Sequence, residues 1–168
     1  MIREKASIVW IPRRIYLSPT TKCPITDHRF SFIIFPMPNN QLFDLLGPLY
    51  DHIFSIRDAD HLHEPLKLPA AGWLLDLGGG TGRACSGLTR HVDQIVICDL
   101  SLAMLQSAQK KGFAHVVQAS ATALPFAADS FERMMVIDAL HHMPDQESTV
   151  GEMTRLVKPG GLLLIEEP

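Results

Sequence analysis

A short apolar run that ends in alternating glycines limits the folds open to this chain. Residues 73–77 read Trp-Leu-Leu-Asp-Leu, and residues 78–83 continue as Gly-Gly-Gly-Thr-Gly-Arg. This order predicts a buried strand, a loop and the first turn of a helix. Glycine lets a ligand approach the backbone closely, and a helix start offers N–H groups that have no partner inside the helix. The segment therefore predicts a binding turn for a nucleotide-type ligand.

Two details of this turn argue against a pyrophosphate ligand. A dinucleotide fingerprint has glycines at its first, third and sixth positions, but the sixth position counted from Gly78 is Arg83. The Asp76 carboxylate would also repel a pyrophosphate, which disfavours a nicotinamide-linked oxidoreductase. The same carboxylate suits S-adenosylmethionine (SAM), because SAM carries an ammonium and a sulfonium and no phosphate.

Composition narrows the class of protein further. The 168 residues are enough for one domain, and 46% hydrophobic and 20% charged residues are typical of a globular chain. A net charge of −3 gives no sign of a nucleic-acid surface, so we expect no nucleic-acid partner. We also expect a cytoplasmic protein with no membrane span and with reduced cysteines, since no apolar run is long enough and no signal peptide is evident. The cysteines and histidines lack metal-site spacing, so no metal is expected.

From residue 73 onward, apolar runs alternate with helical patterns. Strands are predicted at residues 73–77, 94–98, 115–119, 133–137 and 162–165. Helices are predicted at residues 81–91, 101–111 and 145–157, with a turn at 159–161. Continuous apolar strands alternating with helices predict an α/β fold with a doubly wound, mostly parallel sheet covered on both faces. Ligands of such sheets bind at the carboxyl ends of the strands, where Asp76, Asp99 and Asp138 are expected.

Asp99 follows the second predicted strand and is a candidate for binding a ribose. A carboxylate at this place can accept hydrogen bonds from both hydroxyls of a ribose, whichever nucleotide carries it. The alternative is a negative charge that stabilises the N-terminus of the next helix.

Four segments resemble the class I SAM-dependent methyltransferases of the small-molecule type, such as those of ubiquinone and menaquinone biosynthesis. Residues 76–82 resemble the motif acid-x-Gly-x-Gly-x-Gly. Residues 119–132 resemble Gly-Asp-Ala-x-x-Leu-Pro-Phe-x-x-x-Ser-Phe-Asp, with Ser120 in place of the acid and Glu132 in place of the last Asp. Residues 138–145 contain the Leu-His-His pattern, and residues 158–166 contain Lys-Pro-Gly-Gly before an apolar run. The resemblance covers roughly residues 40–168.

This resemblance implies a Rossmann-like fold and transfer of the SAM methyl group to a small-molecule acceptor. The cofactor-binding residues that it implies are Asp76, Gly78, Gly79, Gly80, Gly82, Asp99, Leu100, Ser120, Ala121 and Asp138. His141 is the candidate general base, although a histidine that only packs in its loop is an open alternative. Asp76 could instead be a carboxylate that stabilises the loop, and Leu124-Pro125-Phe126 could be a buried turn as well as a cofactor wall. Tyr50, on a predicted helix over residues 40–56, could close over the cofactor or pack at the edge of the core.

Both ends of the chain depart from the family pattern. Members of this family continue past the fifth strand, so the fold is expected to be truncated there and to leave an open sheet edge. Residues 1–36 contain β-like runs at 8–11 and 32–35 and form an atypical segment, either non-native or replacing the missing strands. Residues 37–168 are predicted to be the SAM-binding domain. A homo-oligomer contact or another partner could also cover the edge, and the chain could be a degenerate SAM-binding module without activity.

Overall fold

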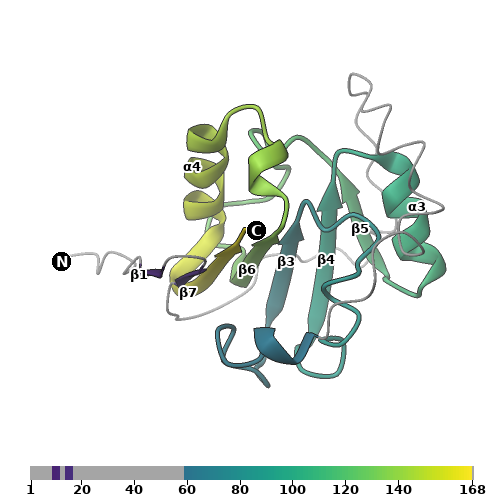
Figure 1. The fold of residues 1–168 in the computed structure, drawn as a ribbon, viewed down its shortest axis with the longest axis horizontal. Coiled ribbons are helices and arrows are strands. Elements are labelled where there is room, and N and C mark those ends of the chain that lie inside the picture. Colours follow the sequence, from purple (N-terminus) through teal and green to yellow (C-terminus); the bar gives the residue numbers. More distant parts are fainter. Residues whose placement is uncertain (1–8, 12–13, 17–58, 168) are drawn as a thin grey trace.

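A seven-stranded sheet forms the centre of the computed structural model, which describes residues 9–11, 14–16 and 59–167 (Figure 1). Its strands are β1 (Val9–Ile11), β2 (Arg14–Tyr16), β3 (Trp73–Leu77), β4 (Gln94–Asp99), β5 (His115–Gln118), β6 (Phe131–Ile137) and β7 (Val157–Glu166). They lie in the order β1-β2-β7-β6-β3-β4-β5. The five strands from β3 to β7 run parallel, which confirms the predicted mostly parallel sheet.

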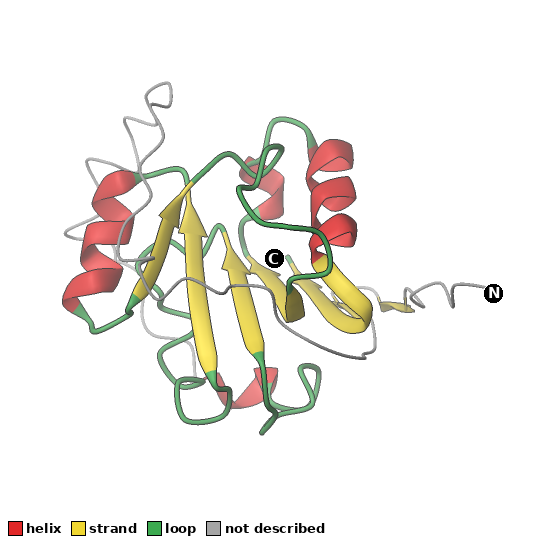
Figure 2. Ribbon diagram, turned by 180° about the vertical axis from the view of Figure 1, so that it is seen from behind, coloured by secondary structure: helices red, strands yellow, loops and turns green. Residues whose placement is uncertain are grey.

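Within the described part of the chain, two α-helices flank this sheet (Figure 2). Each of them begins at a side-chain cap. The helices are α3 (Leu102–Lys110) and α4 (Gln146–Leu156), and the short 3-10 helices are η1 (Ala59–Leu62) and η2 (Leu140–His142). The Ser101 hydroxyl accepts a hydrogen bond from the Met104 N–H at 3.3 Å, and an Asp145 oxygen accepts one from the Ser148 N–H at 2.9 Å. These bonds satisfy N–H groups that the first turn leaves open, and the helices predicted at 101–111 and 145–157 are confirmed.

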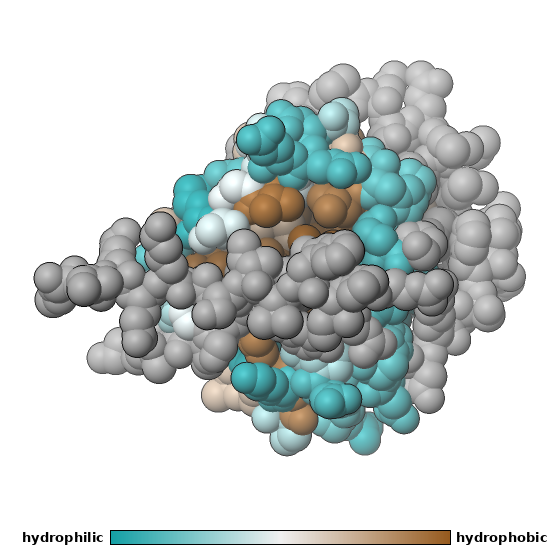
Figure 3. All heavy atoms as spheres, turned by 60° about the vertical axis from the view of Figure 1, so that its left-hand side comes forward, coloured by the Kyte–Doolittle hydropathy of each residue, from teal (hydrophilic) through white to brown (hydrophobic). Residues whose placement is uncertain are grey.

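Each face of the sheet has its own apolar core. On one face, Met153 and Leu156 of α4 pack over Leu75, Val136 and Leu163. On the other face, α3, η1 and residues 81–91 cover alternate residues of the same strands, including Leu74, Met135 and Leu164. The fold is therefore Rossmann-like and doubly wound, as the continuous apolar strands predict. On the face shown in Figure 3, apolar side chains reach the surface among hydrophilic ones.

The helix predicted at residues 81–91 is wrong, because the structure forms consecutive turns there. Gly82 N–H donates to the Gly79 carbonyl at 2.8 Å, and Leu88 N–H donates to the Cys85 carbonyl at 2.9 Å, each across three residues. Gly82 has a φ of +73°, outside the helical range, and a Cβ there would lie 2.4 Å from the Phe113 ring. The positive φ of Gly82 interrupts a regular helix near its start, and the absence of a Cβ leaves room there for the Phe113 ring.

The turn predicted at residues 159–161 lies inside β7 as an irregularity of the ladder. Phe131 pairs with Val157, but Arg133 pairs with Leu162, so four residues of β7 face one residue of β6. At the opposite edge of β7, β2 pairs antiparallel, with Ile15 opposite Ile165. Among the described residues, no helix has both the length and the apolar character that crossing a membrane requires. The predictions for residues 32–35 and 40–56, Tyr50 included, lie outside the described residues.

Candidate functional site

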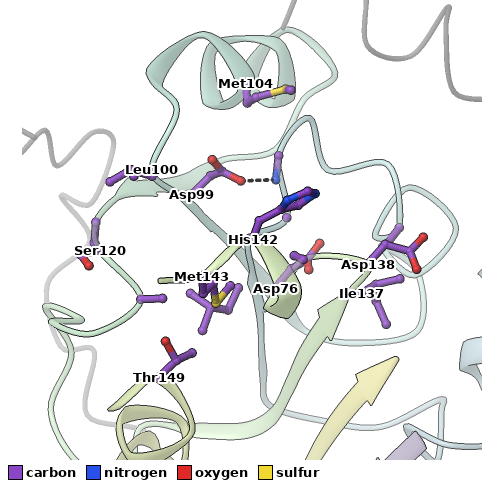
Figure 4. Close-up of a pocket in the computed structure, with 18 of the residues that line it drawn as sticks. Asp76, Asp99, Leu100, Met104, Ser120, Ile137, Asp138, His142, Met143 and Thr149 are labelled. Atoms are coloured by element: carbon purple, nitrogen blue, oxygen red, sulfur yellow. Dashed lines mark hydrogen bonds between the residues drawn. The ribbon is translucent and has the colours of Figure 1, made fainter. Parts of the chain in front are cut away.

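One cavity opens at the carboxyl ends of four neighbouring parallel strands (Figure 4). Its wall combines residues 76–80 from β3 and the loop after it, Asp99 and Leu100 after β4, residues 119–122 after β5, and residues 137–139 after β6. His142, Met143, Pro144 and Thr149 close it from the side of α4. The chain winds in opposite directions from β3 and from β6, so the cavity lies at the switch point of the sheet, where such folds bind ligands.

The glycines after β3 let the loop pack closely on its neighbours. A Cβ at Gly78, whose φ is +72°, would lie 2.7 Å from the Ala139 Cβ. A Cβ at Gly79 would lie 2.6 Å from an Asp76 carboxylate oxygen. Since real Cβ atoms do not approach other heavy atoms this closely, both positions require glycine for the contacts between β3, its loop and the segment after β6.

Asp99 joins the glycine loop to the start of α3. Its Oδ2 accepts a hydrogen bond from Gly80 N–H at 2.9 Å, and its Oδ1 accepts one from Ser101 N–H at 2.8 Å. The residue is only partly buried and lies on the cavity wall. A carboxylate offers about four lone-pair sites, so Asp99 can hold the loop and still accept hydrogen bonds from a ligand's hydroxyl groups.

Asp76 is a buried acid at the base of the cavity. The residue is 1% exposed, and its Oδ2 accepts a hydrogen bond from the Cys85 thiol at 3.2 Å. Burial raises the pKa of Asp76 to about 7, and nearby Asp99 raises it too, while the Cys85 hydrogen bond and Arg83 lower it. Burial also raises the pKa of the Cys85 thiol well above its usual value, so this thiol stays protonated as a donor. Asp76 therefore changes charge near neutral pH, and a cationic ligand would favour its ionised form.

Hydroxyl groups stand where the family resemblance implies an acid. The Ser120 and Thr122 hydroxyl oxygens lie 2.9 Å apart, and Thr122 N–H donates to the Ser120 oxygen at 3.3 Å. Both residues line the cavity beyond Asp99, on the side of β5. A hydroxyl can accept or donate a hydrogen bond but carries no charge, so this end of the cavity is polar and neutral.

An ion pair on α4 holds the segment that leads away from Ser120. Arg155 bonds Glu152 at 2.6 Å and donates to the carbonyls of Phe126 at 2.9 Å and Leu124 at 3.2 Å. Glu152 in turn accepts from Leu124 N–H at 2.9 Å. Neither residue is predicted from the sequence, because an i, i+3 pair of opposite charges is also the pattern of an ordinary exposed helix face.

The segment after β6 brings His142, rather than His141, to the cavity wall. His142 lines the cavity, whereas His141 does not and instead places its Nδ1 2.5 Å from Glu167 Oε2. The rings of the two histidines lie 3.9 Å apart between centroids. Asp138 lines the cavity too and has a φ of +53°, a strained conformation for a residue with a side chain.

Most of the predicted site residues come together at this cavity. Those on its wall are Asp76, Gly78, Gly79, Gly80, Asp99, Leu100, Ser120, Ala121 and Asp138. Gly82, which faces the Phe113 ring, and His141 are not part of the wall. Within the part of the chain that the structure describes, no cluster of three His, Cys, Asp or Glu residues could hold a metal ion.

The residues present fit a nucleoside with cationic groups at one end. The acids Asp76 and Asp138 lie at the β3 and β6 side of the cavity, Asp99 lies after β4, and neutral Leu100, Ser120 and Ala121 lie toward β5. The carboxylates suit an ammonium and a sulfonium, Asp99 suits ribose hydroxyls, and the neutral end suits a base. This order of charges is the one that SAM requires.

Comparison with known proteins finds that this chain is similar to methyltransferases. A family model described as a methyltransferase domain matches residues 75–165. The chain is 38% identical over 104 residues to the ubiquinone/menaquinone biosynthesis C-methyltransferase UbiE of Vibrio parahaemolyticus, covering 56% of this chain and 40% of that protein. It is 28% identical over 170 residues to a rice 2-methyl-6-phytyl-1,4-hydroquinone methyltransferase, covering 91% of this chain and 50% of that protein. The chain thus spans about half the length of these relatives or less.

A solved structure shares the fold. A SAM-dependent methyltransferase of Thermotoga maritima, described as a possible histamine N-methyltransferase, is 26% identical and superposes with a TM-score of 0.59, covering 74% of this chain and 59% of that chain.

Proposed function

Because the chain belongs to the class I SAM-dependent methyltransferases, we propose that it transfers the methyl group of SAM to a small-molecule acceptor. The observation that carries this proposal is the cavity itself, where the glycine loop, Asp76, Asp99 and Asp138 meet at the switch point of the sheet. The acceptor class that we propose is a quinone precursor or a similar small metabolite. The names of the two relatives above support this choice.

We assign the cofactor contacts by charge. Asp99 would accept hydrogen bonds from the ribose hydroxyls, Asp76 and Asp138 would face the cationic end, and residues 100 and 120–121 would contact the base. When bound, SAM supplies an electrophilic methyl group on its sulfonium. The chain's own contribution is alignment of the two reactants in the cavity, and in such reactions alignment is worth up to about 7–11 kcal/mol.

On the acceptor side, we propose His142 as the proton acceptor if the nucleophile starts protonated. The sequence pointed to His141, but His142 is the histidine on the cavity wall. Ala139, Met143 and Pro144 give the same side of the cavity an apolar surface, which suits the ring of a phenol or quinol. An imidazole next to such a ring can take a hydroxyl proton near neutral pH.

A second candidate function is a SAM-binding module that does not turn over. The Ser120 hydroxyl, in place of an acid, favours weaker binding of the base, because a neutral hydrogen bond contributes less than one to a charged group. Binding and turnover separate the two candidates. SAM binding together with transfer of a labelled methyl group to a quinol would support the enzyme, and binding without transfer to any acceptor tested would support the module.

The test is calorimetric titration of the chain with SAM and with S-adenosylhomocysteine. Asp99→Ala should weaken binding roughly 10- to 150-fold, the range expected for a charge-assisted hydrogen bond. Asp93→Ala is the matched control, because its carboxylate bonds Gly72 N–H at 2.8 Å, at the opposite end of β3. If the folded chain binds neither ligand, or if Asp99→Ala binds both as well as the wild type does, the proposed site is wrong.

Three further assignments are proposals of the same kind. We assign the catalytic domain to residues 37–168 and a covering role to residues 1–36, which the pairing of β2 with β7 supports. With that edge carrying β2, a homo-oligomer or partner at the sheet edge is the less favoured arrangement. We propose the cytoplasm as the location, on the ground that Cys85 and Cys98 are free thiols.

A further inference from the structure

A single carboxylate, that of Glu167, holds the segment that follows β6. Its Oε1 accepts hydrogen bonds from Leu140 N–H at 2.8 Å and Ala139 N–H at 3.2 Å. Its Oε2 lies 2.5 Å from the Nδ1 of His141 and accepts from the His141 N–H at 3.3 Å. Glu167 directly follows β7, which is paired with β6 up to Ile137 and Glu166, so the ends of these two strands bring the carboxylate beside these donors.

The segment held by Glu167 is one wall of the proposed reaction cavity. Ala139, His142 and Met143 line the cavity, and Leu140 and His141 lie between them. The segment is also tied internally, since His142 N–H donates to the Ala139 carbonyl at 3.1 Å and Met143 N–H to the Leu140 carbonyl at 3.0 Å. Bonds to the amides of residues 139–141 therefore fix the start of a turn whose later residues line the cavity.

The contact with His141 reaches the cavity through ring packing. A carboxylate only accepts hydrogen bonds, so the proton of this bond is on His141 Nδ1, and the bond fixes both the tautomer and the ring orientation. The His142 ring packs against that ring, with 3.9 Å between centroids and 47° between planes. Glu167 thereby fixes the surface on which the cavity-lining histidine rests.

We propose that Glu167 is a positioning residue of the reaction cavity, acting through residues 139–141 to hold His142 and Met143 on its wall. The role in catalysis rests on the proposed methyltransferase function, whereas the positioning itself does not. Glu167 is not on the cavity wall, so its effect is indirect. The effect of Glu167 also differs from the effect of its neighbour Glu166, whose side chain lies 3.3 Å from His61 of η1.

The test compares Glu167→Gln with Glu166→Gln, which removes the adjacent charge but no bond to residues 139–141. Hydrogen exchange followed by mass spectrometry should show the amides of residues 139–141 exchanging roughly tenfold faster or more in Glu167→Gln. In calorimetry the same variant should bind S-adenosylhomocysteine several-fold more weakly. Glu166→Gln should match the wild type in both measurements. Unchanged exchange in Glu167→Gln, or equal effects of the two substitutions, would overturn the proposal.

A measurement on the unchanged protein keeps the proposal testable if Glu167→Gln fails to fold. Nitrogen-15 spectra of histidine-labelled wild-type protein distinguish the two neutral tautomers. We expect a proton on the His141 Nδ1, and an Nδ1 that carries no proton would refute the bond to Glu167. If the wild type does not bind S-adenosylhomocysteine, the proposed function fails, but the exchange rates and the tautomer still decide the role of Glu167.

Discussion

Replacing Asp76 by Asn should stabilise the protein by an amount that grows with pH. Asp76 is buried at the base of the cavity, and burial is the largest cause of its raised pKa. Asparagine has nearly the same shape, and its oxygen can still accept the hydrogen bond from the Cys85 thiol. The substitution therefore removes the charge while it keeps the packing.

The magnitude follows from the two pKa values of this carboxyl group. The pKa of Asp76 is about 7 in the folded protein, whereas the ordinary pKa of 3.8 applies in the unfolded chain. Between these values the folded state binds more protons than the unfolded state, so the stability contributed by Asp76 is highest below pH 3.8 and is lost as the pH rises to about 7. The loss amounts to about 2 kcal/mol at pH 5 and about 4 kcal/mol at pH 8. Asp76→Asn should thus gain about 2 to 3 kcal/mol over the wild type between pH 5 and pH 8.

Urea unfolding of both proteins at several pH values between 5 and 8 measures this gain directly. Circular dichroism gives the midpoint and slope at each pH, and the difference in free energy of unfolding is plotted against pH. A difference that is the same at pH 5 and pH 8 would refute the reasoning, because it would mean that Asp76 ionises in the fold as easily as it does in water.

Three further predictions concern the same cavity. Cys85→Ala removes a hydrogen bond that lowers the pKa of Asp76, so this pKa should rise further. In urea unfolding, the stability that Asp76 contributes should then continue to fall up to a higher pH than in the wild type. The same change should add no pH dependence in the Asp76→Asn background. S-adenosylhomocysteine, whose ammonium favours ionised Asp76, should bind roughly tenfold more tightly at pH 8 than at pH 6 in calorimetry, with no such change in Asp76→Asn. Ser120→Asp should strengthen the same binding by roughly tenfold through a charged acceptor for the base, and unchanged affinity would place the base elsewhere.

The strands could be predicted because their signal is local. Leu74, Leu75 and Leu77 form an apolar run that is interrupted by an acid one residue before its end, and the strand lies where this run predicts it. The carboxyl ends of parallel strands share one edge of the sheet, so the meeting of Asp76, Asp99 and Asp138 at the cavity also followed from the sequence.

The remaining features depend on contacts between distant residues, which no local pattern contains. Near the start of the turns at residues 81–91, Phe113, about 30 residues further along the chain, packs into the space beside Gly82. The pattern Leu-His-His could not show which histidine faces the cavity, because that depends on how the 3-10 turn is held by Glu167. Contacts between distant residues also explain why Glu132 replaces the last Asp of the family motif. Its carboxylate accepts from Trp73 N–H at 2.7 Å and pairs with buried Lys158, at the end of β3 away from the cavity.

The two carboxylates beside the glycine loop show how the fold prepares a site for a cation. Asp99 has both oxygens bonded to backbone N–H groups of its own chain, so the fold stabilises it as an anion. Asp76 has a weak thiol donor and is buried, so its ionised form is destabilised until a further positive charge arrives. If stability were the only requirement at position 76, a neutral residue such as asparagine would be expected there. An acid that lowers stability at neutral pH and lines a ligand cavity is expected where binding a cation compensates for it, and the ammonium of SAM is such a cation.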